Sequence, residues 1–85
     1  FNQGHVCCAG SRLLVQEGVA ATVLAKLKRR IQVLRVGDPM DKNTDIGAIN
    51  SKAQLDKIRD LVDSGVKEGA ELYQPACKLP AKGWY

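Results

Sequence analysis

The chain has 85 residues, of which 45% are hydrophobic and only 5% are aromatic, and its formal net charge at pH 7 is +4. This length allows at most one small domain, and the composition supplies few large side chains for its core. No stretch approaches the roughly 18 apolar residues of a membrane-spanning helix, so we expect no membrane segment in this chain.

Three cysteines and one histidine are the residues best suited to thiol or metal chemistry: Cys7, Cys8, Cys77 and His5. An odd number of cysteines, two of them adjacent, does not suit a secreted disulfide framework and favours a reducing compartment. A structural zinc site needs about four ligands at recognisable spacing, and the sequence contains no CxxC pair. We therefore expect a cytoplasmic protein with no metal site.

The first half of the chain contains a strand pattern followed by a helix pattern. Residues 12–16 (RLLVQ) are a short apolar run between polar flanks, which predicts a buried strand. Apolar residues then recur at helical spacing and form one broad stripe, which predicts a helix over residues 18–35. Gly37, with Pro39 two residues later, is well placed to end this helix.

A cluster of basic residues lies inside this predicted helix: Lys26, Lys28, Arg29 and Arg30. Such a cluster can bind phosphates or act as a localisation signal. Alternatively, it is the solvated face and cationic end of a helix, where positive charge complements the helix dipole. We favour the second interpretation, because no aromatic residues interleave for base stacking, and we expect no nucleic-acid partner.

The second half begins with a connection over residues 36–51 that is rich in turn-forming residues. Ser51, with Gln54 three positions later, suits a capping box. The apolar spacing that follows predicts a helix over residues 52–67, which Gly65 or Gly69 ends.

Residues 70–73 (AELY) can form another strand, so the order is strand, helix, helix, strand. This order predicts an α/β class with a parallel sheet. Two strands and two one-sided helices cannot cover both faces of a parallel sheet, so the predicted segment needs neighbours that it does not contain.

The motifs resemble the aldehyde dehydrogenase superfamily over essentially all 85 residues. The opening FNQGHVC is similar to that family's active-site signature, in which a glycine, here Gly4, stands three residues before the nucleophilic cysteine, here Cys7. The connection from Gly37 to Gly47 and a glycine before a strand, here Gly69, also match the family. In detail the chain most resembles aldehyde dehydrogenase family 16.

The resemblance implies a Rossmann-like catalytic domain of which residues 1–85 are a part, with residues 1–11 as the nucleophile loop. It implies an aldehyde substrate, NAD or NADP as cofactor, and a homo-oligomeric parent. By resemblance, Cys7 is the nucleophile of a thiohemiacetal and thioester pathway, and its backbone N–H belongs to the oxyanion hole. The asparagine donor, the glutamate base and the cofactor site precede this segment in the family, so we expect the isolated segment to be inactive.

Two residues leave alternatives open. His5 stands where the family usually has glutamine or glutamate, which favours a second hypothesis of a catalytically silent domain that acts as a protein-interaction scaffold. Cys8 could be oxidised together with Cys7 or compete with it as nucleophile. We expect instead a small buried side chain that faces away, because adjacent residues of an extended loop point to opposite sides.

Overall fold

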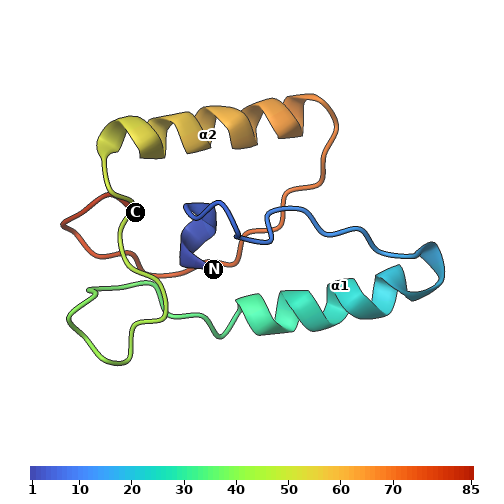
Figure 1. Ribbon diagram of the computed structural model, residues 1–85, viewed down its shortest axis with the longest axis horizontal. Helices are drawn as coiled ribbons and strands as arrows, with labels where there is room; N and C mark the ends of the chain where they lie inside the picture. The colour runs from blue at the N-terminus through green and yellow to red at the C-terminus, as the bar shows by residue number, and fades with distance from the viewer. The chain divides into compact units, whose positions relative to one another are not determined.

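The computed structural model describes all 85 residues and contains three helical elements, seen in Figure 1. They are a short 3-10 helix η1 (Asn2–Gly4), helix α1 (Glu17–Ile31) and helix α2 (Lys52–Lys67). The chain forms two compact units, Phe1–Leu34 and Arg35–Tyr85. The first unit carries η1 and α1, and the second carries α2.

Helix α1 is shorter than the predicted range 18–35. After Ile31 the chain continues in a tighter turn, in which Val33 N donates to Arg30 O (3.4 Å) and Leu34 N donates to Ile31 O (3.2 Å). Such three-residue bonds satisfy the last carbonyl groups of a helix without extending it. The prediction that Gly37 ends this helix is therefore wrong, because the helical bonding is complete well before Gly37.

Helix α2 coincides with the predicted range 52–67. At its start the Ser51 hydroxyl oxygen accepts a hydrogen bond from Gln54 N (3.2 Å), which satisfies one of the orphan N–H groups. At its end Gly69 has φ of +100°, Gly69 N donates to Val66 O (3.0 Å), and Ala70 N donates to Gly65 O (2.9 Å). These paired bonds form a Schellman motif with Gly69 in the left-handed position, so Gly69 ends the helix and Gly65 lies inside it.

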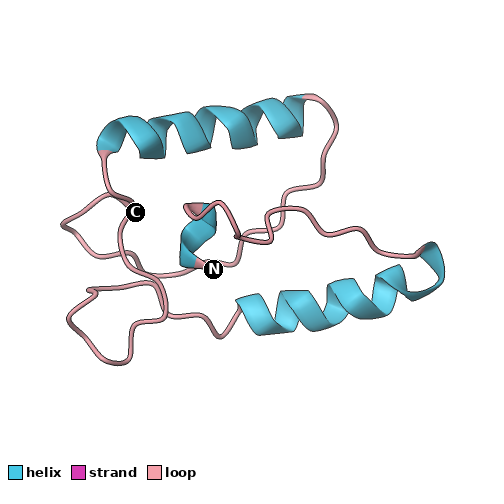
Figure 2. Ribbon diagram, in the orientation of Figure 1, coloured by secondary structure: helices cyan, strands magenta, loops and turns pink.

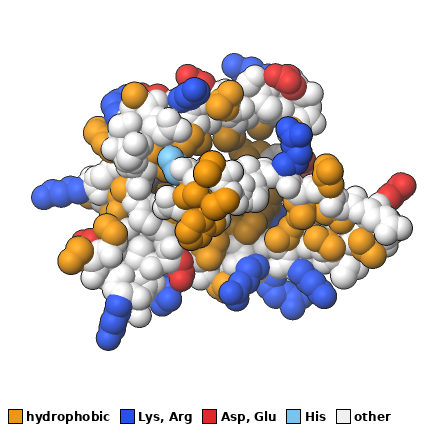
Figure 3. Space-filling view, in the orientation of Figure 1, with side chains coloured by type: hydrophobic (Ala, Val, Ile, Leu, Met, Phe, Trp, Pro, Cys, Tyr) orange, Lys and Arg blue, Asp and Glu red, His pale blue; other side chains and the backbone are white.

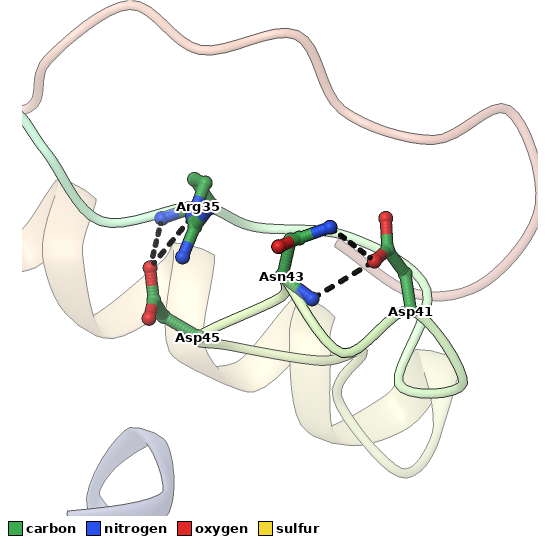
Figure 4. Close-up of polar contacts among 4 residues, drawn as sticks. All are labelled: Arg35, Asp41, Asn43 and Asp45. Carbon is green, nitrogen blue, oxygen red and sulfur yellow. Dashed lines mark hydrogen bonds and ion pairs between the residues drawn. The ribbon is translucent and has the colours of Figure 1, made fainter.

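The connection between the helices is a series of side-chain-stabilised turns, as its composition predicts. The Asp41 carboxylate accepts from both the backbone N (2.8 Å) and the side-chain N (3.1 Å) of Asn43, as Figure 4 shows. The Asp45 carboxylate accepts hydrogen bonds from the backbone N (2.9 Å) and the Nε (3.4 Å) of Arg35. Backbone bonds from Ile46 N to Arg35 O (3.0 Å) and from Gly37 N to Ile46 O (2.9 Å) also join the two ends of this loop, and they make Val36 and Ile46 an isolated parallel bridge.

The two predicted strands are absent. Residues 12–16 and 70–73 belong to no ladder, and Figure 2 contains no strand. The other β pairing is one isolated antiparallel bridge between Ile49 and Trp84. An apolar run becomes a strand only when another extended segment pairs with its N–H and C=O groups, and neither run is in a β ladder here. The two helices agree with the predicted α/β class, whereas the predicted Rossmann-like sheet is not shown.

No side chain in the chain is fully buried. The apolar stripe of α1 is about half exposed, at 49% for Val19 and 50% for Leu24, and Leu14 before it is 88% exposed. Figure 3 shows apolar side chains at the surface along one side of α1 and cationic side chains along another. The helical periodicity thus correctly predicts α1, but the apolar face of this helix stays exposed in this chain. None of the helices is long and apolar enough to span a bilayer.

Candidate functional site

Residues 1–11, the predicted nucleophile loop, begin with a left-handed turn. Gly4 N donates to Phe1 O (3.1 Å), and His5 N donates to Asn2 O (3.0 Å). Three successive residues have positive φ, namely Asn2 (50°), Gln3 (52°) and Gly4 (78°). This conformation is unfavourable for residues with a Cβ. Backbone strain of this kind is concentrated at functional sites, and here its last residue, Gly4, stands three residues before Cys7.

A second turn contains both thiols. Ala9 N donates to Val6 O (2.9 Å), so Cys7 and Cys8 are the two central residues of a β-turn. Both cysteines are exposed and free. The expectation that Cys8 is buried is therefore wrong, because it assumed an extended backbone and the backbone here is turned.

The chemistry available in this loop is nucleophilic. The N–H groups of Cys7 and Cys8 donate no hydrogen bond within the chain, so the Cys7 N–H is available to an oxyanion. The His5 Nδ1 atom lies 3.3 Å from Asn2 O, within its own turn. The one acidic residue among residues 1–34 is Glu17, which begins α1. The loop therefore supplies a thiol and an oxyanion donor but no carboxylate base of its own.

The residues of this chain do not fit a dinucleotide cofactor. Such a site places the pyrophosphate on a glycine-rich turn that joins a strand to the N-terminus of a helix. Here α1 follows Gln16 and α2 follows Ser51, and no strand precedes either helix. No group of three or more His, Cys, Asp or Glu side chains could hold a metal ion.

A hollow of about 400 Å³ lies within the second unit, between α2 and the segment that follows it. Its polar lining includes Arg59, whose guanidinium donates to Tyr85 O (3.3 Å), and Asp63. Cys77 is exposed and free but does not line this hollow. The hollow therefore offers no nucleophile, and the nucleophile loop remains the candidate site.

The basic cluster lies on the last turns of α1. Lys26, Arg29 and Arg30 are exposed and, together with Val33, line a hollow of about 260 Å³. None of these three cations forms an ion pair or hydrogen bond through its side chain within the chain. Their position near the C-terminus of a helix is the one at which cations stabilise the dipole.

A model of the aldehyde dehydrogenase family matches residues 1–85, the whole of this chain. A protein from Staphylococcus epidermidis is 40% identical over 72 residues, and proteins from Staphylococcus haemolyticus and Staphylococcus aureus are 42% identical over 72 residues. Each bears the name "Putative aldehyde dehydrogenase". The alignments cover 85% of this chain and 15% of each relative, so the chain spans about 15% of the length of these curated relatives. No solved structure matches it.

Proposed function

We propose, since this chain belongs to the aldehyde dehydrogenase family, that it is the nucleophile-bearing segment of an enzyme that oxidises an aldehyde to a carboxylic acid. The observation that carries the proposal is the loop geometry: an exposed thiol, Cys7, stands three residues after Gly4, the last residue of a turn with positive φ, and its own N–H has no acceptor in the chain. We propose that residues 1–11 are the active-site signature of this family.

In the proposed reaction the Cys7 sulfur attacks the aldehyde carbon and forms a thiohemiacetal. A thiol suits this step because sulfur is intrinsically nucleophilic near neutral pH. The aldehyde oxygen becomes an oxyanion, and the Cys7 N–H donates a hydrogen bond to it.

The later steps need groups that this chain does not supply. NAD or NADP, when bound, accepts a hydride, and the residues here do not fit that cofactor. A base is needed to hydrolyse the resulting thioester, and the loop contains no carboxylate. We propose that both lie elsewhere in a longer, cytoplasmic, homo-oligomeric parent, similar in detail to aldehyde dehydrogenase family 16. The 85-residue chain alone should therefore give no NAD(P)-dependent turnover.

A catalytically silent scaffold is the second candidate, and His5 is the feature that favours it. His5 replaces the usual glutamine or glutamate of the signature, and its ring lies against the backbone of its own turn. A parent that folds but reduces no NAD(P) with any of several aldehydes would favour the scaffold over the enzyme.

The test compares NAD(P)H formation by the full-length parent with that of Cys7→Ser and Cys8→Ser. We expect Cys7→Ser to lose at least about a thousandfold in kcat, because a serine hydroxyl without an adjacent base is a weak nucleophile. Cys8→Ser should keep most of the activity. If Cys8→Ser is the inactive variant instead, the nucleophile is Cys8 and the assignment of Cys7 is wrong.

A further inference from the structure

We propose that Ser11 is a positioning residue for the nucleophile, because its hydroxyl group helps to hold the turn that contains Cys7. The hold on the turn depends only on contacts within residues 1–11. Its consequence for catalysis rests on the proposed function of Cys7.

The turn that contains the two thiols closes on Ala9. The Ala9 N–H donates to Val6 O (2.9 Å), and this bond makes Cys7 and Cys8 the central residues of the turn. The Ala9 carbonyl oxygen in turn accepts two hydrogen bonds from one residue, since Ser11 N donates to it at 2.9 Å and Ser11 Oγ at 3.4 Å. A carbonyl oxygen has two lone pairs, so both donors can bind at once. Ser11 therefore restrains the residue on which the turn closes.

Gly10, between Ala9 and Ser11, is the reason that this restraint matters. Glycine loses more conformational freedom on folding than any other residue. A Cβ built on Gly10 meets no atom within 4 Å, so packing does not hold this position either. The two hydrogen bonds of Ser11 span Gly10 and join its two neighbours. A side-chain substitution at Ser11 removes the Oγ bond alone and leaves the backbone bond in place.

The same hydroxyl group lies beside the positive-φ turn at the start of the loop. At Gly4, where φ is +78°, the atom nearest to the position of a Cβ is Ser11 Oγ, at 3.7 Å. The Ser11 side chain is thus next to the turn that precedes the nucleophile and is bonded to the turn that contains it. A displacement of about 1 Å in a reacting group can cost a hundredfold in rate, so a loosened turn has a measurable effect.

Hydrogen exchange of the full-length parent tests the hold on the turn, with overlapping peptides that resolve the Ala9 amide. We expect this amide to exchange at least about threefold faster in Ser11→Ala than in the unmodified protein, because the turn opens more often. Ser11→Thr keeps the hydroxyl group and should exchange like the unmodified protein. Ser64→Ala is the matched control, since Ser64 Oγ also donates a hydrogen bond, to Glu68 Oε1 (2.9 Å), but lies in α2. It should leave the exchange of Ala9 unchanged.

Steady-state kinetics of the same variants test the consequence for catalysis. We expect Ser11→Ala to lower kcat about tenfold and to change KM less than twofold, because a misaligned thiol affects the attack on the aldehyde more than its binding. Ser11→Thr should keep kcat within twofold of the unmodified protein, and Ser64→Ala should leave it unchanged.

The outcomes separate this proposal from the proposed function. Unchanged exchange of Ala9 in Ser11→Ala, or exchange in Ser11→Thr as fast as in Ser11→Ala, overturns the proposal. Faster exchange with an unchanged kcat overturns the positioning role as well. Faster exchange in a parent that oxidises no aldehyde supports the hold of Ser11 on the turn and contradicts only the proposed function.

Discussion

Gly4 holds a backbone conformation that a side chain would strain, with φ of +78°. A Cβ built at Gly4 has Ser11 Oγ as its nearest neighbour, at 3.7 Å, which is ordinary contact. Glycine is therefore favoured at position 4 because of its positive φ, and not because a larger side chain would clash. Gly4 closes a turn that lies before the two thiols, so we expect a change in its φ to alter the backbone path that leads to Cys7.

We expect Gly4→Ala to lower kcat of the full-length protein about tenfold. A residue with a Cβ in the left-handed conformation costs about 1–2 kcal/mol. If the turn shifts to relieve that strain, Cys7 moves from its position, and we expect the activation free energy to rise by a comparable amount. Gly10→Ala is the control, since Gly10 has no positive φ and no atom lies within 4 Å of its added Cβ. Equal activity of the two variants would show that the turn does not position Cys7.

At the scale of elements, the two glycines near the end of α2 have opposite roles. Gly65 lies in the helix, whereas Gly69 is the left-handed residue of the Schellman motif. An added Cβ meets nothing within 4 Å at either position, so each substitution changes backbone preference alone. The two positions thus separate helix propensity from capping without a steric contribution.

We expect Gly65→Ala to stabilise α2 by about 0.5–1 kcal/mol, because alanine is the better helix former. We expect Gly69→Ala to destabilise it by about 1–2 kcal/mol, because alanine disfavours positive φ. Hydrogen exchange of the α2 amides in the full-length protein measures both changes. Slower exchange in Gly69→Ala than in the unmodified protein would contradict the assignment of the helix end.

The second prediction at the scale of elements concerns the basic residues of α1. Residues 1–34 contain five Lys or Arg residues and one acidic residue, while residues 35–85 contain eight of each, so the net charge of +4 belongs to the first unit. Arg29→Gln with Arg30→Gln should change the free energy of unfolding by only about 0.5 kcal/mol, as expected for exposed side chains. The unmodified protein should show no salt-sensitive DNA binding. Binding that weakens steeply with salt and disappears in the double variant would favour a phosphate-binding surface.

The sequence predicts the helices of this chain better than its strands, for a physical reason. A helix satisfies its backbone hydrogen bonds within one segment, so the apolar spacing and the Ser51 cap suffice to predict α2. A strand needs a neighbouring strand, and residues 12–16 and 70–73 belong to no β ladder. At the candidate site, the spacing from Gly4 predicts Cys7 by family resemblance. The sequence does not predict that Cys8 is exposed, because this exposure follows from a turn that is closed by a hydrogen bond between backbone atoms.

At the scale of the whole molecule, the absence of any fully buried side chain limits the free energy that folding gains from the hydrophobic effect. Burial of apolar surface is the dominant favourable contribution to folding, at about 25 cal/mol per Å². Leu14, Met40 and Phe1 are each exposed by more than four-fifths, at 88%, 90% and 86%. Ordering of the backbone costs roughly 1–2 kcal/mol for each residue, and a chain with no fully buried side chain gains little burial to oppose that cost. The apolar faces of the helices are therefore suited to packing against further protein.

We therefore expect the 85-residue chain on its own to unfold without a cooperative transition. Differential scanning calorimetry should show no heat-absorption peak, because cooperative unfolding requires a core that is lost all at once. Far-UV circular dichroism should show partial helix that declines gradually with temperature, since α1 and α2, at 15 and 16 residues, are near the length at which isolated helices are marginal in water. The full-length parent is the control and should give a sharp transition. A sharp peak from the 85-residue chain would mean that it buries a core by itself, and the exposure of its apolar side chains would then be wrong.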